Sequence, residues 1–295
     1  MNLPFYPALV FLAALWGASF LFMRLAAPVL GPVWLIALRV FIAGLVLLPL
    51  VIRRGQLPVL RANLGRLVAV GVMSAALPFT LLAYASLELS AGLTSILNAT
   101  VPIFAALIGY LVFEERLDAA RIFGVVLGFV GVVILIGLPT DAGTPPLLSV
   151  LAGLCAAVSY VFAANFARRR LHHVSGIVFV TGGQLGAALV MLPLLPFFPV
   201  REMPGPAIVV AVTALAVLST SLAFLIYFRL IREVGPMRTL TVTYLIPVFA
   251  IVWGAVFLDE VVTLAMAVGG GLILSGVALA NRRTAISSRP PDVGD

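Results

Sequence analysis

The chain has 295 residues, of which 63% are hydrophobic and 10% are charged, and its formal net charge is +7. An average soluble domain is about 45–50% apolar and about 25% charged, and a soluble chain of this size still requires a polar surface. This composition excludes a soluble enzyme, a nucleic-acid-binding protein and a disordered chain, and it indicates a protein embedded in a lipid bilayer.

The apolar residues fall into ten runs that are each long enough to cross a membrane. A helix needs about 20 mainly apolar residues to span a hydrocarbon layer about 30 Å thick. Because ten such helices leave only short connectors, we expect an all-α membrane protein without a soluble domain. The predicted spans are 5–24, 33–52, 67–87, 91–113, 120–138, 148–167, 175–196, 206–228, 238–258 and 263–280.

Arginine is distributed unevenly between the two sets of connectors. Runs such as Arg53–Arg54 and Arg168–Arg170 lie on one side of the predicted spans, whereas Arg201 stands almost alone on the other side. Positively charged loops stay in the cytoplasm, so we expect both termini to be cytoplasmic. The expected location is the inner (plasma) membrane of a bacterium, crossed by an even number of helices.

The two halves of the chain resemble each other at a step of 145 residues, which relates Pro102 to Pro247 and Gly109 to Gly254. Each half holds five predicted helices, an odd number, so the second half enters the membrane upside down. Such inverted repeats are typical of secondary transporters, whose substrate site lies near the bilayer midplane between the repeats. A channel, or a duplication without mechanical meaning, is the alternative. The predicted organisation is a first five-helix repeat at 1–139, a periplasmic linker at 140–146, an inverted repeat at 147–281 and a polar cytoplasmic tail at 282–295.

Prolines inside the predicted spans mark candidate hinges. Pro102 and Pro247 lie near the middles of the fourth and ninth spans, and Pro78 lies in the third. Proline has no N–H, so the backbone carbonyls four residues before the first two, at Asn98 and Thr243, lose a partner. An unpaired carbonyl is costly in lipid, so these positions are expected to face a central watery cavity. The alternative is that the prolines only shape the packing.

Several polar and aromatic side chains lie at membrane depth and are candidates for binding a substrate. Tyr84 and Tyr227 form a pair between the halves, and Tyr84 is favoured as the cavity residue because Tyr227 lies beside a basic loop. The alternative for each Ser and Thr is a hydroxyl that bonds to its own backbone. The remaining candidates are Trp16, Ser19, Asn98, Thr80, Thr100, Ser159, Tyr160, Gln184, Thr243 and Tyr244.

Arg39 is the only clear charge well inside a predicted span. We expect Arg39 either to hold a substrate carboxylate or to act as a structural clamp. No Asp or Glu lies at the centre of a span, so we expect transport without an intramembrane carboxylate relay. The sequence predicts no catalytic residue, metal site or cofactor, and therefore no enzyme. The expected partners are a small-molecule substrate and the lipid bilayer, with the chain a monomer or a weak homodimer.

The chain resembles the EamA family of the drug/metabolite transporter superfamily over essentially its whole length. The resemblance is carried by Trp16–Gly17, Ser19–Phe20, the stretch from Pro32 to Phe41, the stretch from Pro102 to Leu117 with Gly124, Gly128 and Gly131, and the echo from Pro247 to Glu260. It implies ten helices in two inverted halves around a central cavity, and the export of small metabolites.

Within this family, the length and layout are similar to those of the YddG-type exporters of aromatic and other amino acids. The resemblance therefore implies export of an aromatic or another neutral amino acid by alternating access. Only Arg39 is available as a cation for the cavity, which argues against a multiply charged anion. A lipid-carrier flippase or a multidrug exporter of the same superfamily is the alternative.

Overall fold

The computed structural model describes residues 4–114, 117–137, 144–200 and 202–281, and all regular structure within them is helical. The helices of the first half are α1 (Phe5–Leu30), α2 (Pro32–Arg53), α3 (Leu57–Ala62), α4 (Leu64–Gly71), η1 (Val72–Ala76), α5 (Leu77–Ala85), α6 (Ala91–Asn98), α7 (Val101–Phe113) and α8 (Ala119–Gly137). The helices of the second half are α9 (Leu147–Arg170), α10 (Gly176–Met191), η2 (Leu192–Phe197), α11 (Pro206–Ala216), η3 (Val217–Leu222), α12 (Ala223–Val234), α13 (Pro236–Thr239), α14 (Val242–Leu258) and α15 (Leu264–Ala280).

Eight helical segments are long and apolar enough to cross a membrane. Four of them are the single helices α1, α2, α8 and α9. The other four join consecutive helices and cover Leu64–Ala85, Ala91–Phe113, Gly176–Phe197 and Pro206–Val234. The helices α14 and α15 are also apolar, but each has 17 residues. The chain is therefore a multi-span membrane protein.

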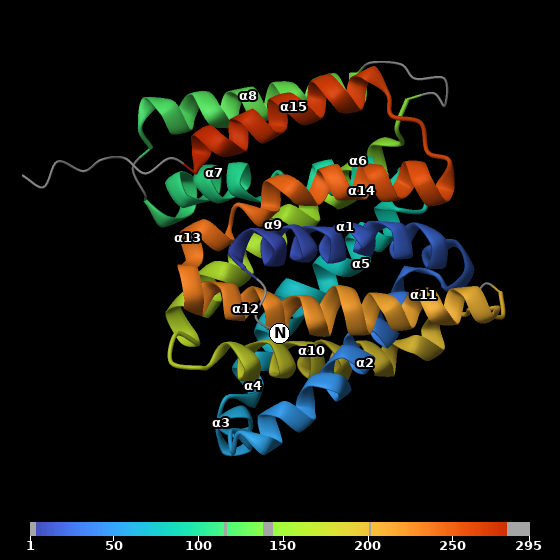
Figure 1. Cartoon of the computed structure of the whole chain (residues 1–295), viewed down its shortest axis with the longest axis vertical. Coiled ribbons are helices and arrows are strands. Elements are labelled where there is room, and N and C mark those ends of the chain that lie inside the picture. Colours follow the sequence, from blue (N-terminus) through green and yellow to red (C-terminus); the bar gives the residue numbers. More distant parts are fainter. Residues whose placement is uncertain (1–3, 115–116, 138–143, 201, 282–295) are drawn as a thin grey trace, which may run out of the picture.

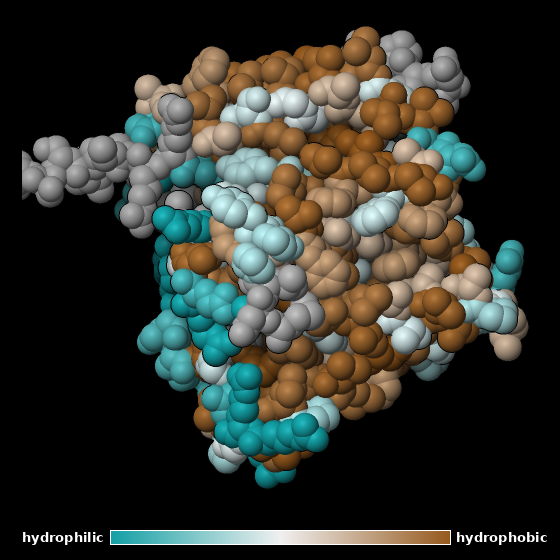
Figure 2. Space-filling model, in the orientation of Figure 1, coloured by the Kyte–Doolittle hydropathy of each residue, from teal (hydrophilic) through white to brown (hydrophobic). Residues whose placement is uncertain are grey.

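The long helices lie side by side in stacked layers, and their connections gather at two opposite ends (Figure 1). One end carries α3 and α13 and is called the α3 end; the other carries the connection at Gly31 between α1 and α2 and is called the Gly31 end. Helices far apart in sequence pack together, as α1 does with α14, and α10 with α2 and α4. Figure 2 shows an apolar surface along the helices and hydrophilic residues gathered at the α3 end.

Two sharp connections between helices use the same local chemistry. Gly31 has a φ of 79° and Gly235 a φ of 84°, in the region that favours glycine because a Cβ would clash there. A proline follows each glycine, at Pro32 and Pro236, and opens the next helix. Proline suits the first helical position because its φ is already helical and the N–H it lacks has no partner there.

The helices α8 and α15 form one edge of the molecule and pack with their backbones in direct contact (Figure 1). A Cβ atom added to Gly124 would lie 2.7 Å from the carbonyl oxygen of Gly276, and one added to Gly131 would lie 2.7 Å from that of Gly269. Small residues allow this close approach in membranes, where apolar side chains gain little by leaving lipid. These glycines therefore pack the two halves of the chain against each other.

The predicted interruption at Pro102 is present, because α6 ends at Asn98 and α7 begins at Val101. The predicted interruption at Pro247 is wrong, since α14 runs without a break through that residue. The break in the second half lies earlier, between α13 and α14 at Leu240. Pro247 is therefore only the sixth residue of its helix, near the N-terminus, where few intrahelical bonds precede it.

Two segments of π-helix widen the spans that contain them. They are η1, between α4 and α5, and η3, between α11 and α12, and their first residues, Val72 and Val217, lie 145 residues apart. Pro78 lies at the second position of α5, directly after η1. A π-turn frees carbonyls from the regular ladder, and such turns occur frequently at functional sites.

Candidate functional site

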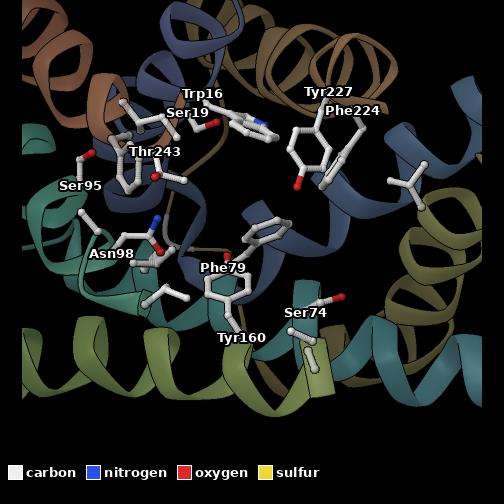
Figure 3. A pocket seen from close by; sticks show the side chains of 18 of the residues that line it. Trp16, Ser19, Ser74, Phe79, Ser95, Asn98, Tyr160, Phe224, Tyr227 and Thr243 are labelled. Carbon is white, nitrogen blue, oxygen red and sulfur yellow. The ribbon is translucent and has the colours of Figure 1, made fainter. Parts of the chain in front are cut away.

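A cavity of about 490 Å³ lies at the centre of the helices, between elements of both halves. Its wall is formed by α1, α5, α6, α7, α9, α10, α12 and α14, with single residues from α2, α4 and η1 (Figure 3). The volume falls within the range of about 300–1,000 Å³ that is usual for small-molecule sites. Eight of the predicted binding residues line this cavity: Trp16, Ser19, Arg39, Asn98, Tyr160, Gln184, Tyr227 and Thr243.

The cavity wall repeats the internal similarity of the chain. Positions 145 residues apart face the same space, as Phe79 and Phe224 do. The other pairs at this step are Arg39 with Gln184, Leu82 with Tyr227, Ser95 with Leu240, Asn98 with Thr243, Val101 with Ile246 and Pro102 with Pro247. The two halves therefore contribute equivalent backbone positions, but most pairs carry different side chains.

Aromatic rings make up much of the cavity wall and surround one open space (Figure 3). The ring centroid of Trp16 lies 5.2 Å from that of Tyr227 and 5.9 Å from that of Phe224. On the opposite side, Phe79 and Tyr160 meet edge to face at 6.3 Å. Such rings offer large apolar faces, while the two tyrosines add hydroxyl groups.

Arg39 places a positive charge on this wall, with its side chain almost completely buried at 3% exposure. Its Nε donates to Thr220 Oγ1 at 3.0 Å, and its Nη1 contacts the sulfur of Met23 at 3.8 Å. Its guanidinium carbon lies 3.7 Å from the ring centroid of Phe79. Within the described ranges, no carboxylate forms an ion pair with Arg39. The cavity therefore contains a cation balanced only by neutral partners.

The π-helix η3 positions the hydroxyl that accepts from Arg39. The Thr220 hydroxyl donates to the carbonyl oxygen of Leu215, five residues earlier, at 2.8 Å. The neighbouring Ser221 hydroxyl is within reach of the carbonyl oxygens of Ala216, at 3.1 Å, and of Ala43 in α2, at 3.3 Å. The wider turn thus connects α2 with the second half and leaves the Thr220 oxygen free to accept.

Five of the predicted binding residues are not among those that line the cavity: Thr80, Tyr84, Thr100, Ser159 and Tyr244. Three of their hydroxyls donate to backbone carbonyl oxygens. Thr80 donates to Ala76 at 2.7 Å, Thr100 donates to Leu97 at 2.6 Å, and Ser159 donates to Met73 at 2.7 Å. Such bonds satisfy a buried hydroxyl without a ligand. The hydroxyl of Tyr244 accepts from Asn281 Nδ2 at 3.1 Å.

The preference for Tyr84 over Tyr227 is also corrected. Tyr84 is 36% exposed and does not line the cavity, whereas Tyr227 lines it with its ring against that of Trp16. The prediction placed Tyr227 at the membrane interface because it lies near a basic loop. A residue near the end of a helix can nevertheless point its side chain into the cavity. Pro78 lies outside the cavity wall, whereas Pro102 and Pro247 are part of it.

Several wall residues escaped the sequence analysis, among them Ser74, Phe79, Ser95 and Phe224. A signal existed for the two phenylalanines, since they lie 145 residues apart and Phe79 directly follows Pro78. Among the described residues, the wall contains no Asp or Glu, and no three His, Cys, Asp or Glu side chains lie close enough to hold a metal ion.

The cavity extends toward the α3 end, where the exposed residues Leu240 and Asn281 line it. Toward the Gly31 end, a polar cluster joins the halves. Arg24 Nη1 donates to the carbonyl oxygens of Ser86, at 2.9 Å, and Leu87, at 2.6 Å, while its Nε lies 3.8 Å from Glu260 Oε1.

Glu260 ties this cluster to α6. Both of its carboxylate oxygens lie 3.0 Å from the backbone nitrogen of Ala91, which donates to them. Burial raises the pKa of the Glu260 carboxyl above its ordinary value, while the Ala91 N–H and the charge of Arg24 act in the opposite direction. A buried carboxyl of this kind is sensitive to the loss of its cationic neighbour.

Taken together, the fold and the cavity define a multi-span membrane protein whose two related halves enclose a central cavity. A model of the EamA-like transporter family matches this chain twice, over residues 5–137 and 147–282. The chain therefore belongs to the EamA-like transporter family, as its sequence motifs indicate.

Individual relatives cover nearly the whole chain. An uncharacterized transporter of Archaeoglobus fulgidus is 24% identical over 91% of this chain and 95% of its own length. The uncharacterized inner membrane transporter YedA of Escherichia coli is 24% identical over 85% of this chain and 82% of its own. A probable terminal-alkyne amino-acid exporter of Streptantibioticus cattleyicolor is 27% identical over 94% of this chain and 93% of its own length. These names and the family identify the chain as a membrane transporter and not an enzyme.

The fold is also shared with a protein of known structure. A crystal structure that is 24% identical in sequence covers 92% of this chain and 95% of that chain, with a TM-score of 0.67. At this level of identity, the similarity shows a common fold.

Proposed function

We propose that this transporter exports neutral α-amino acids with apolar or aromatic side chains. The observation that carries the proposal is the buried charge of Arg39 on a cavity wall that otherwise consists of aromatic and neutral groups. A guanidinium binds a carboxylate through two parallel hydrogen bonds, and this pairing would complete the partners of Arg39. The rings of Trp16, Phe224 and Tyr227 provide apolar faces for a substrate side chain.

Amino acids are favoured over the other cargoes of this superfamily. One relative is named a probable terminal-alkyne amino-acid exporter. A cavity of about 490 Å³ suits a free small molecule better than a sugar joined to a long lipid, which disfavours a lipid-carrier flippase. A single wall cation also disfavours multiply charged anions. A multidrug exporter is the second candidate, because the aromatic wall also suits flat organic molecules.

We further propose that the chain crosses a bacterial inner membrane ten times and carries both termini in the cytoplasm. In this topology α14 and α15 also span the bilayer, and the α3 end faces the cytoplasm. Repeats at 1–139 and 147–281 then have opposite orientations, the linker 140–146 is periplasmic and the tail 282–295 is cytoplasmic. The hydrophilic surface at the α3 end supports this orientation (Figure 2). Because one chain encloses the cavity, a monomer suffices for transport.

The proposed mechanism is alternating access driven by the gradient of the substrate itself. The equivalent wall positions of the two halves allow the site to open toward either side of the membrane. No carboxylate on the described wall is available to carry a proton through the cavity. A strict dependence of transport on a proton gradient would contradict this part of the proposal.

The test is counterflow in proteoliposomes with a panel of single amino acids, sugars, nucleosides and cationic drugs. We expect unlabelled neutral amino acids inside the vesicles to drive accumulation of a labelled one, with or without a proton gradient. Selective counterflow of any other class would overturn the proposed substrate. Passive flux without saturation would indicate a channel and overturn the mechanism.

A further inference from the structure

A second polar group faces the cavity besides Arg39. It consists of Ser19 in α1 and of Ser95 and Asn98 in α6, and we call it the acceptor group. Ser19 is 5% exposed and Ser95 is 1% exposed. The oxygens Ser19 Oγ, Ser95 Oγ and Asn98 Oδ1 are buried and have no hydrogen-bond partner within the described chain. Figure 3 shows the three side chains on one side of the cavity, near Thr243.

The missing partners are unusual for hydroxyls in a helix. A buried serine or threonine normally donates to a carbonyl of the preceding turn, as Ser74 does to Val70 at 2.6 Å and Ser86 does to Leu82 at 2.9 Å. Ser19 and Ser95 do not use this option. Buried polar atoms in native proteins nearly always have a partner. Seven buried side-chain oxygens of the described chain lack one, and these three belong to residues that line the cavity, where a ligand can supply the missing hydrogen bond.

The acceptor group also breaks the symmetry of the cavity wall. The position equivalent to Ser95 is the apolar Leu240, and the position equivalent to Asn98 is Thr243. The Thr243 hydroxyl donates to the carbonyl oxygen of Leu240 at 2.8 Å, so it already has a partner. Of the four unpartnered buried oxygens on the described wall, three lie in the first half and one, Gln184 Oε1, lies in the second. A ligand with two different polar ends would therefore meet different groups in its two orientations.

All three oxygens can accept a hydrogen bond from one donor group. An amide oxygen only accepts, and each serine hydroxyl can accept while it donates elsewhere. An ammonium group carries three N–H donors, which matches three oxygens. We propose that the acceptor group binds the α-ammonium of the substrate while Arg39 binds its carboxylate. This inference rests on the proposed function, and it assigns the polar ends of an amino acid to separate parts of the wall.

Three ligands that differ only at the polar ends test the assignment on the purified protein. They are an amino acid that the wild-type protein transports, the same acid without its amine, and the amine without its carboxylate. Affinities are measured from the ligand-induced rise in Tm in detergent. We expect wild-type protein to bind the amino acid at least tenfold more tightly than the deaminated acid.

In the double variant Ser95→Ala/Asn98→Ala, the affinities for the amino acid and for the deaminated acid should differ by less than about threefold. Thr94→Val is the matched control, because Thr94 Oγ1 is also buried without a partner but Thr94 does not line the cavity. This control should keep the wild-type preference. Ser95→Ala alone removes a single atom and should give an intermediate preference if the double variant does not fold.

The possible failures are distinguishable. If wild-type protein neither binds nor transports any amino acid, the proposed function is wrong. If it does both, but the Ser95→Ala and double variants keep the full preference for the amine, the acceptor group binds only water and the inference is overturned. Asn98→Asp gives an independent check, since an added carboxylate should strengthen binding of the amine that lacks a carboxylate by at least threefold.

Discussion

At the scale of single residues, the burial of Arg39 determines most of what the cavity can bind. An arginine removed from water needs charged or hydrogen-bonding partners to offset the lost hydration. Thr220, Met23 and the ring of Phe79 supply some of them, and none carries a negative charge. Arg39 therefore connects α2 to η3 and also lines the cavity, where the proposed function has it bind a substrate carboxylate.

We predict that Arg39→Gln weakens binding of a neutral amino acid by roughly tenfold to a hundredfold, because a hydrogen bond to a charged group contributes about 1.5–3 kcal/mol. Thermal stability should stay the same or rise, since the variant removes a buried charge. Isothermal titration calorimetry and Tm measurements in detergent test both statements. Arg229→Gln, which alters an exposed pair with Glu233, serves as the control. Undiminished affinity in Arg39→Gln would place the carboxylate elsewhere.

Aromatic residues form the second determinant at this scale. Trp16 contacts both Phe224 and Tyr227, so its loss should disturb the whole apolar wall. We predict that Trp16→Ala reduces the affinity for an aromatic amino acid more than tenfold but the affinity for alanine less than threefold. Competition against a labelled substrate in proteoliposomes provides the comparison. An equal loss for both amino acids would show that Trp16 does not contact the substrate side chain.

At the scale of elements, the close backbone contact of α8 with α15 and the π-helical turns of η1 and η3 have different structural effects. The helices α8 and α15 meet through glycines and form a rigid edge. The segments η1 and η3 widen the helices beside the cavity and leave backbone carbonyls free to accept from side chains. The carbonyl oxygen of Leu215, for example, accepts from the Thr220 hydroxyl. Packing stabilises the outer edge, whereas the irregular turns shape the site.

The glycine contacts give a direct stability prediction. A Cβ atom on Gly276 would lie 2.5 Å from the carbonyl oxygen of Gly124, whereas a Cβ atom on Gly271 in the same helix would meet nothing within 4 Å. Gly276→Ala should lower stability by about 1–3 kcal/mol, the usual cost of overpacking. Gly271→Ala should leave Tm unchanged or raise it slightly, because alanine favours the helix. Equal Tm values for the two variants would argue against the close contact.

At the scale of the whole molecule, the cavity extends toward the α3 end, while polar contacts join the two halves at the Gly31 end. Four contacts at the Gly31 end join the halves. Glu260 pairs with Arg24 and accepts from the Ala91 nitrogen at 3.0 Å, Trp34 Nε1 donates to the carbonyl oxygen of Phe198 at 2.5 Å, and the Glu202 nitrogen donates to that of Val29 at 3.2 Å. In the proposed alternating-access mechanism, these contacts break when the site opens on that side.

We predict that Glu260→Gln raises access to the cavity from the Gly31 end several-fold, because the Arg24 pair loses its charge. A Leu82→Cys probe inside the cavity, in a Cys155→Ser background, is labelled with a maleimide that cannot cross the membrane and is added on that side. Arg229→Gln again provides the control. Unchanged labelling would mean that the ion pair does not hold this end shut.

The same probe should respond to pH. Burial raises the pKa of Glu260, and the carboxyl is neutral below its pKa, so the attraction to Arg24 is lost as the pH falls through that value. Labelling of Leu82→Cys should therefore increase as the pH on that side falls, and the dependence should be absent in Glu260→Gln. A response that persists in Glu260→Gln would assign the effect to another group.

The sequence by itself determined the class of the protein. A membrane-spanning helix is recognised from its length and hydropathy, because a single apolar segment in lipid satisfies its own backbone hydrogen bonds only as a helix. The step of 145 residues and the motifs around Pro102 and Pro247 likewise identified two halves and the EamA family, which the family match confirms. These properties depend on local composition and spacing, which a sequence displays directly.

The tertiary structure decided which face of each helix meets the cavity. A lipid chain is as apolar as a protein interior, so hydropathy does not distinguish an outward face from an inward one. Tyr84 and Tyr227 have the same chemistry, yet only Tyr227 faces the cavity. The partner of Arg39 is Thr220, 181 residues away in sequence, and the π-turn that presents it leaves no mark in composition. Only the packing of the helices against one another brings such distant side chains onto one wall.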